Sequence, residues 1–282
     1  MKIRTKVMLA IMLAVALSII GVTVMVSHEM NKAFINNFRS SSKAQLDRMN
    51  AFVENFFETA MATADFFVAS PLVQNNVEHL TSYVDRKEDY TPVGAGLPDG
   101  ERDLYEELLR LTKKFPAYAL AYVGNKQGGF TQAPDDQLSP GYNPPQRPWY
   151  KDAVKAGKAV VTEAYISDSA QGGAVCTVAA PIPAANGSGF AGVVGFDISL
   201  DTLTRETGSV TVGKTGYVLM LDSLGQVISD PRHSGKDISE DKRWLGKKID
   251  ELPAEAAKAL TSAKNGQQEV SLDGRQWLAS AD

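Results

Sequence analysis

The stretch Tyr142-Asn143-Pro144-Pro145-Gln146-Arg147-Pro148-Trp149-Tyr150 combines a stiff backbone with closely spaced recognition side chains. Two adjacent prolines restrict the chain ahead of Arg147, and residues 151–157 predict a short helix that ends at a glycine. Arginine offers a planar fork of donors to a carboxylate, tryptophan an N–H and a flat wall, and tyrosine a hydroxyl on an apolar body. The stretch therefore indicates a site for a small, flat anionic group, unless its aromatic residues only fill a core.

A carboxylate far downstream supplies the opposite charge. Residues 192–199 form a strongly apolar strand pattern in which Phe196 and Ile198 share one face and Asp197 lies on the other. An ionised carboxylate buried there without a partner costs several kcal/mol, so it needs a cation or several hydrogen-bond donors. A lysine or arginine of the protein, a cap on a helix starting near Leu200, and the ammonium of a ligand all meet that need.

The motif and the distant aspartate together resemble a known family. Their order and internal spacing match the Y-x4-R-x-W-Y…D pattern of amino-acid-sensing double Cache (dCache_1) domains, in the residues Tyr142, Arg147, Trp149, Tyr150 and Asp197. The resemblance covers nearly all of the chain beyond residue 27. It implies an α+β fold of two PAS-like antiparallel-sheet modules, and the extracytoplasmic sensor of a bacterial methyl-accepting chemotaxis protein.

An α-amino acid then suits the site. Its carboxylate is expected on Arg147 with the Trp149 N–H as a further donor, and its ammonium on Asp197 and Tyr150, with Tyr142 closing the pocket. Two tyrosines and an acid resemble further pocket residues of the family, although core or loop roles are open to them: Tyr122, Tyr165 and Asp168.

Composition excludes several classes of function. The chain has 282 residues, a net charge of −4 and intermixed acids and bases, without the basic patch that nucleic-acid binding requires. Cys176 is the only cysteine, which rules out an intrachain disulfide and a multi-cysteine metal site. No catalytic residue, metal or cofactor is predicted, and we expect a binding protein rather than an enzyme.

The N-terminus predicts a membrane anchor. Residues 7–27 are almost uniformly apolar over a length that matches a bilayer-spanning helix. Residues 1–6 carry three basic side chains and no acid, which favours a cytoplasmic N-terminus and an extracytoplasmic sensor at the inner membrane. A cleaved signal peptide is the alternative, but the apolar run is long and the cleavage sequence poor.

A long stalk helix is predicted over residues 28–70. It contains no glycine or proline, its apolar residues recur at three- and four-residue steps, and Ser70-Pro71 is expected to end it. A helix of this length has more apolar surface than a small domain can cover. It is expected to pack along both modules or against a second subunit, and the resemblance implies a homodimer through this helix.

The membrane-distal module with the ligand site is assigned to residues 71–199. A helix is predicted at 103–115, a solvated connector at 90–100, and strands at 117–123, 130–133, 159–166, 174–181 and 190–199.

Residues 200–282 are assigned to a smaller membrane-proximal module. It is expected to hold a linking helix at 199–206, a second helix at 255–263 and paired strands at 267–272 and 276–281. Family members normally continue into another strand, a second transmembrane helix and an output domain, so the module is expected to be truncated at Asp282.

Two alternative functions are left open. The same sensor could read an amine or a carboxylate in a histidine kinase or a cyclic-dinucleotide enzyme. A membrane-anchored hydrolase that uses Asp168 and Asp197 is disfavoured, because the sequence lacks a nucleophile elbow, a triad and a metal cluster.

Overall fold

The structure is a computed structural model that describes residues 3–167, 173–208, 210–212, 215–233, 238–239, 242–263, 268–272 and 274–279. Contacts between residues divide the chain into two compact units, one running up to Arg48 and the other beginning at Met49.

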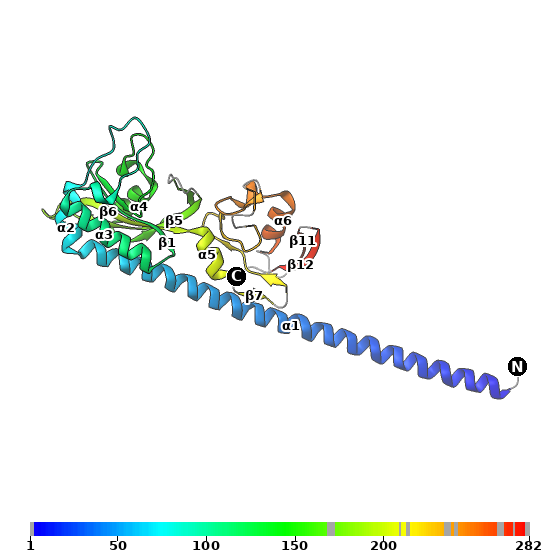
Figure 1. Cartoon of the computed structure of the whole chain (residues 1–282). Helices are drawn as coiled ribbons and strands as arrows, with labels where there is room; N and C mark the ends of the chain where they lie inside the picture. The colour runs from blue at the N-terminus through cyan, green and yellow to red at the C-terminus, as the bar shows by residue number, and fades with distance from the viewer. Residues whose placement is uncertain are drawn as a thin grey trace. The chain divides into compact units, whose positions relative to one another are not determined.

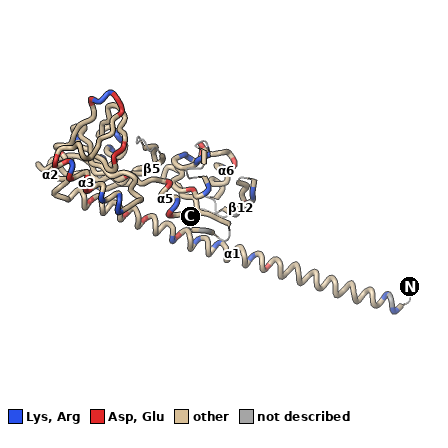
Figure 2. Tube along the Cα trace, in the orientation of Figure 1, with Lys and Arg blue, Asp and Glu red and all other residues tan. Residues whose placement is uncertain are grey.

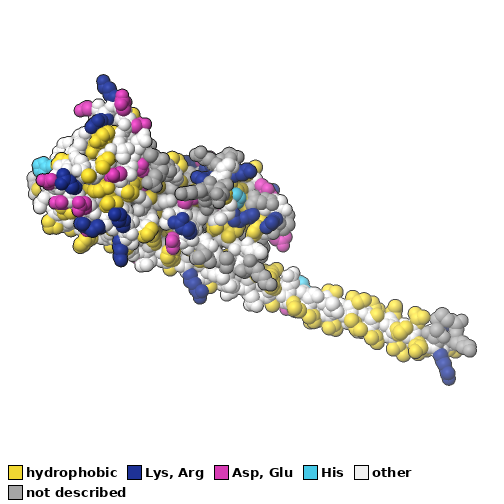
Figure 3. All heavy atoms as spheres, viewed as in Figure 1, with side chains coloured by type: hydrophobic (Ala, Val, Ile, Leu, Met, Phe, Trp, Pro, Cys, Tyr) yellow, Lys and Arg dark blue, Asp and Glu magenta, His cyan; other side chains and the backbone are white. Residues whose placement is uncertain are grey.

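The first unit is the N-terminal part of helix α1 (Ile3–Ala69), which continues unbroken through the predicted anchor and stalk (Figure 1). Between Lys6 and Glu29 this helix carries no Asp, Glu, Lys or Arg (Figure 2), and apolar side chains cover the same stretch (Figure 3). Among the described helices, α1 is the one long and apolar enough to cross a membrane.

The predicted end of the long helix is confirmed. α1 ends at Ala69, and Ser70 takes an extended backbone conformation before helix α2 (Pro71–Asn76). The Ser70 hydroxyl accepts a hydrogen bond from the Leu72 N–H at 3.3 Å, which caps the new helix, and Pro71 occupies the first helical position, where no N–H is needed.

The second unit is built on a six-stranded antiparallel sheet (Figure 1). The strand order is β2-β1-β6-β5-β3, and β4 pairs with β5 beside β3. The strands are β1 (Tyr118–Asn125), β2 (Phe130–Ala133), β3 (Val160–Val161), β4 (Tyr165–Ile166), β5 (Ala174–Pro183) and β6 (Phe190–Ser199).

Different helices cover the two faces of this sheet. Apolar side chains of α3 (Asp99–Lys114) and of the end of α1 pack with Phe196 and Ile198 on one face. Helix α4 (Pro148–Ala156) packs on the other face, the side where Asp197 and its neighbour Val193 lie. The alternation predicted for β6 is therefore confirmed.

One predicted strand and one predicted helix differ in extent. The strand at 159–166 is divided into β3 and β4, because the Thr162 hydroxyl takes the Thr177 N–H at 2.9 Å in place of a main-chain carbonyl. The helix predicted at 103–115 begins four residues earlier, at Asp99. Two acids in its first turn, Asp99 and Glu101, stabilise this start because their charges interact favourably with the positive end of the helix dipole.

The prediction of a solvated connector at residues 90–100 holds for part of the segment, in which most side chains are exposed but several positions are anchored to the protein. Tyr90 and Leu138 exchange two main-chain hydrogen bonds at 3.1 and 2.8 Å, which ties this segment to the loop after β2. Pro92, Gly94 and Leu97 are buried, and the Gly94 N–H donates to Asp135 Oδ1 at 3.2 Å. Buried anchoring positions thus lie between exposed ones along this connector.

The rest of the second unit is made of small elements. Helix α5 (Leu200–Thr207) follows β6 directly and is capped by the Ser199 hydroxyl. The later elements are β7 (Thr211–Val212), β8 (Gly216–Tyr217), β9 (Met220–Leu221), β10 (Val227–Ser229), α6 (Ala254–Ala263), β11 (Gln268–Leu272) and β12 (Arg275–Ala279). The described strands pair as three two-stranded sheets, around a core that includes Val227, Trp244 and Leu252.

Candidate functional site

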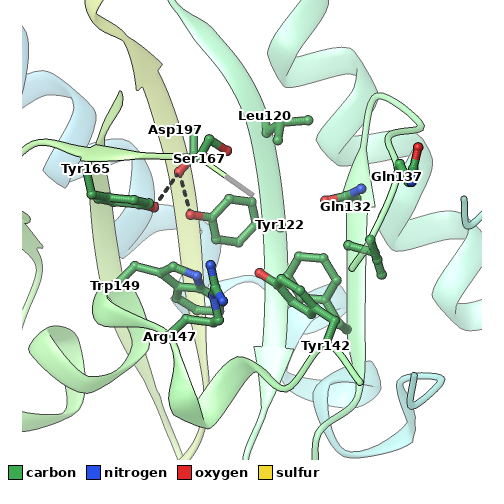
Figure 4. A pocket seen from close by; sticks show the side chains of 12 residues that line it. Leu120, Tyr122, Gln132, Gln137, Tyr142, Arg147, Trp149, Tyr165, Ser167 and Asp197 are labelled. Carbon is green, nitrogen blue, oxygen red and sulfur yellow. Dashed lines mark hydrogen bonds between the residues drawn. The ribbon is translucent and has the colours of Figure 1, made fainter. Parts of the chain in front are cut away.

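A pocket lies on the α4 face of the sheet (Figure 4). The space between its walls is about 360 Å³ with the open mouth counted, but the part wide enough for a water molecule is only about 20 Å³. The lining side chains are Leu120, Tyr122, Phe130, Gln132, Gln137, Leu138, Tyr142, Arg147, Trp149, Tyr165, Ser167 and Asp197. Because the pocket is this narrow, we expect its half-buried outer side chains to move when a ligand enters.

The register of three strands places the acidic end of the pocket. Asp197 of β6 pairs with Leu120 of β1 on one side and with Thr177 of β5 on the other. Two pairs further along, and so on the same face of the sheet, Tyr122 of β1 is opposite Gly195 of β6. A Cβ at Gly195 would overlap the Tyr122 ring. The glycine therefore lets the ring lie across β6 and brings its hydroxyl to Asp197.

Three hydroxyls surround one oxygen of Asp197. Tyr122 and Thr177 each donate to Asp197 Oδ1 at 2.6 Å, and the Tyr165 hydroxyl lies 3.3 Å from the same oxygen (Figure 4). Tyr165 is also 2.6 Å from Thr177 Oγ1, so its proton is best placed to complete a chain from Tyr165 through Thr177 to Asp197. Within the described residues, all hydrogen bonds that this carboxylate accepts reach Oδ1, which leaves Oδ2 available to a ligand.

Burial sets the protonation of this cluster. Asp197 is 3% exposed, and the loss of hydration raises its pKa, although the hydroxyls of Thr177, Tyr122 and Tyr165 and the charge of Arg147 act in the opposite direction. Burial, followed by the charge of Asp197, also raises the pKa of both tyrosines. The phenols therefore stay protonated at neutral pH and can donate to the carboxylate.

The start of α4 places the basic end of the pocket. Arg147 has an extended backbone at the N-cap, Pro148 opens the helix, and Trp149 is turned inward with 2% of its surface exposed. The Trp149 ring fits against Gly124, where a Cβ would come within 2.9 Å of it. Its Nε1–H donates to no acceptor in the described part of the chain, although tryptophan N–H groups usually find a partner when buried.

Arg147 and Tyr142 form the outer wall. The guanidinium carbon of Arg147 lies 5.4 Å from the centre of the Tyr142 ring, and that ring packs on Phe130 with 4.6 Å between centroids. Both residues are half-buried, and in Figure 4 their polar ends project into the pocket on the side facing Tyr122. The pocket thus has donors on one side and a carboxylate on the other.

The structure brings six of the eight predicted residues together in this pocket: Tyr122, Tyr142, Arg147, Trp149, Tyr165 and Asp197. Tyr150 is not among the lining side chains; it is buried behind Trp149, with the two rings 5.6 Å apart, and burial raises its pKa to about 12. Asp168 falls outside the described residues.

The sequence prediction missed six lining residues: Leu120, Phe130, Gln132, Gln137, Leu138 and Ser167. Leu120 lies two positions from Tyr122 on the same strand, so strand alternation alone could have placed it on the same face. Gln132 and Phe130 of β2 enter through their pairing with Tyr122 and Gly124, a register that the sequence does not reveal.

The arrangement suits binding. Within the described residues, no group of three or more His, Cys, Asp or Glu side chains could hold a metal ion. A buried carboxylate supplied with hydroxyl donors, facing an arginine and an indole N–H, matches a small molecule that carries a cation and an anion a few bonds apart.

Comparisons with known proteins agree with the fold. The chain is 35% identical over 163 residues to the methyl-accepting chemotaxis protein McpA of Pseudomonas putida, a match that covers 58% of this chain and 23% of that protein. It has the fold of the ligand-binding domain of the Pseudomonas aeruginosa chemoreceptor PctB, solved with L-Arg (24% identity, TM-score 0.54, 79% of each chain covered).

It also has the fold of the ligand-binding domain of PctC from the same organism, solved with GABA (22% identity, TM-score 0.52, 82% of this chain and 86% of that one covered). The family model for the Cache domain of the dCache_1 type matches residues 26–282. The chain therefore belongs to the double Cache (dCache_1) family of sensor domains.

Proposed function

We propose that this chain is the extracytoplasmic sensor region of a membrane-anchored chemoreceptor, and that its pocket binds an L-α-amino acid as the zwitterion. The ammonium binds Asp197 Oδ2, and the carboxylate binds Arg147 and the Trp149 N–H. Tyr142 covers the bound ligand. Asp168, which the resemblance also implicates, remains a proposed member of the site.

One observation carries this proposal: the pocket is lined by a carboxylate, Asp197, and by a guanidinium, Arg147, with an indole N–H beside the guanidinium. Burial raises the pKa of Asp197, and the hydroxyl donors that converge on Oδ1 offset part of that shift in favour of the charged form. The indole N–H of Trp149 supplies a donor on the wall that holds Arg147. Each charge-assisted hydrogen bond contributes about 1.5–3 kcal/mol, so a few of them support micromolar binding of a small ligand.

The comparisons support the role of the whole protein. McpA is a chemotaxis protein, and the PctB and PctC domains were solved with an amino acid and with an amino-acid-like zwitterion. The apolar part of α1, preceded by basic residues, is suited to anchor the sensor at the inner membrane. We further propose that residues 71–199 form the membrane-distal module, that residues 200–282 form the proximal one, and that two copies pair through α1.

Paired alanine variants test the site. In the whole chain purified in detergent, Arg147→Ala and Asp197→Ala should each weaken L-amino acid binding by at least about tenfold, because each removes one charged partner. Arg110→Ala and Asp99→Ala on the exposed face of α3 are matched controls, since their charged side chains lie in solvent away from the pocket. Calorimetry supplies the affinities and circular dichroism the folding check.

Two outcomes contradict the proposal. If both folded pocket variants keep the wild-type affinity, the ligand binds elsewhere. If only Asp197→Ala loses binding and amines bind as well as amino acids, the protein senses an amine.

A further inference from the structure

Gln132 lies in the pocket on the far side of Tyr122 from Asp197. On this face of the sheet, Gln132 of β2 pairs with Tyr122 of β1, and Asp197 of β6 lies one strand beyond and two pairs further along. Neighbouring strands are about 4.8 Å apart. A ligand held at Asp197 by its ammonium can therefore extend its side chain across β1 toward Gln132.

The orientation of the Gln132 amide is fixed by its single protein partner. Its Nε2 donates to the main-chain oxygen of Asp136 at 2.7 Å. A carbonyl oxygen only accepts hydrogen bonds, so the nitrogen must face Asp136 and the oxygen must face the other way. Figure 4 shows this oxygen directed toward Tyr122 and the interior of the pocket.

The amide oxygen is left without a donor. Gln132 as a whole is 4% exposed, and its Oε1 accepts no hydrogen bond from any described residue, but this oxygen is not among the fully buried atoms because it borders the open space of the pocket. A ligand that fills the pocket removes this oxygen from water, so a ligand with an N–H or O–H at that point keeps its hydrogen bond and a ligand without one leaves it unpaired.

The described lining residues near Gln132 are uncharged, which limits the kind of ligand side chain that can bind there. Among the described lining residues, the ones that carry a charge are Arg147 and Asp197, which the proposed function assigns to the α-carboxylate and α-ammonium. The walls near Gln132 are Leu120, Phe130 and Leu138 together with the second amide of Gln137. A charged ligand side chain there would lose hydration without gaining a counterion.

We propose that Gln132 determines side-chain specificity, and that the pocket selects L-amino acids whose side chain carries a neutral hydrogen-bond donor, such as an amide or a hydroxyl. This inference rests on the proposed function, since it requires the zwitterion to bind between Arg147 and Asp197. Beyond the proposed function, the inference names Gln132 as the residue that contacts the ligand side chain and names neutral hydrogen-bond donors as the groups that it binds.

Ligands of matched shape test this selection without any variant. Glutamine, glutamate and methionine differ at the end of side chains of similar length, as do asparagine, aspartate and leucine. By calorimetry on the whole chain in detergent, the amide member of at least one set should bind about fivefold or more tightly than the acidic and apolar members, which is the gain from one added hydrogen bond. Equal or tighter binding of the acid or the apolar member in both sets overturns the inference.

A variant then assigns the selection to Gln132. In Gln132→Met, the preference for the amide over the apolar ligand should fall to less than about twofold. The ratio isolates the lost hydrogen bond, because both ligands meet the same altered loop. Gln74→Met is the matched control: Gln74 also donates its Nε2 to a main-chain oxygen, that of Val68 at 2.6 Å, but it does not line the pocket. Its amide preference should equal that of the wild type.

The possible results distinguish a failure of the Gln132 assignment from a failure of amino-acid binding itself. If amino acids bind but Gln132→Met keeps the full amide preference, the specificity assignment is wrong while the proposed function stands. If no amino acid of either set binds the wild-type protein, both are wrong.

Discussion

The hydroxyls of Tyr122, Thr177 and Tyr165 all approach Asp197 Oδ1, and yet the pKa of the carboxyl is raised because burial outweighs these donors. A side chain that served only to hold the sheet together would gain nothing from being charged there. A bound ammonium would offset this cost, because its charge and its hydrogen bonds replace the hydration that the carboxylate lost on folding. At the scale of the residue, the buried Asp197 carboxylate lowers the stability of the ligand-free protein, and the proposed ligand removes that cost when it binds.

This cost predicts an unusual response to Asp197→Asn. Asparagine can accept the same hydroxyls at its oxygen without a charge, so the free energy of unfolding of the ligand-free protein at pH 7 should be unchanged or higher. Because burial raises the pKa of Asp197 in the folded chain, its contribution to stability is present at low pH and is lost as the pH rises through that pKa. Any advantage of asparagine should therefore be greatest above the pKa that Asp197 has in the folded chain and should shrink as the pH is lowered below it, as measured by urea unfolding across a pH series.

Thr177→Val is the matched contrast, because it removes a donor from the same cluster with little change of shape. It should lower the free energy of unfolding by about 1–3 kcal/mol, since it leaves a buried acceptor with one partner fewer. If Asp197→Asn at pH 7 is as destabilising as Thr177→Val, Asp197 has a structural role and the ligand assignment loses its basis.

Individual residues were predictable where a motif or alternation fixes them. Asp197 could be placed on its face from the pattern of β6 alone, and Arg147 and Trp149 from the proline-restricted turn. Tyr150 shows the limit: neighbours in the first turn of a helix point in different directions, and the structure places Tyr150 behind Trp149. Gln132 carries no local signal, because its role depends on an amide orientation set by Asp136.

At the scale of elements, two glycines make the sheet compatible with the site. Gly195 of β6 leaves room for the Tyr122 ring, and Gly124 of β1 leaves room for Trp149 and Pro144 of the segment that leads into α4. Both glycines lie in strand interiors, where a missing side chain normally weakens the sheet. The close approach of an aromatic ring at each position explains their presence.

Gly195→Ala should therefore damage the site through β1. The new methyl group must displace the Tyr122 ring, which removes a donor from Asp197 Oδ1, so we expect a loss of about 1–3 kcal/mol in stability together with weaker amino acid binding. Thermal unfolding and calorimetry measure the two effects. Gly96→Ala is the control, because a Cβ there meets no atom within 4 Å. A fully stable Gly195→Ala protein with wild-type affinity would show that Tyr122 is not held in this way.

Elements were predictable in kind more readily than in extent. The strands and the order of helices follow from alternation and from the proline and glycine positions, but the division of residues 159–166 depends on a contact between Thr162 and Thr177 that is distant in sequence. The segment 90–100 has the composition of an exposed loop and is exposed at most positions, but its start is tied by Tyr90 to Leu138, a partner far along the chain. Long-range contacts modify the local pattern in both cases.

At the scale of the whole molecule, the predicted anchor and stalk are one continuous helix, and the dCache_1 match begins at residue 26, near the end of the apolar stretch. The sequence predicted a membrane-spanning helix over residues 7–27 and a stalk helix over residues 28–70 as separate elements, because a long apolar run and a helix without glycine or proline are strong local signals. How a bound ligand alters the rest of a chemoreceptor is a question of differential affinity between two states, which sequence patterns do not report.

The central claim is that Arg147 and Asp197 hold the two charges of one zwitterion. Calorimetry on the whole chain in detergent, with an L-amino acid, the amine that lacks its carboxylate and the acid that lacks its ammonium, tests this most directly. Each truncated ligand should bind at least about tenfold more weakly than the amino acid, because each lacks the charge-assisted hydrogen bonds of one end of the zwitterion. An amine or an acid that binds as tightly as the parent amino acid would contradict the account.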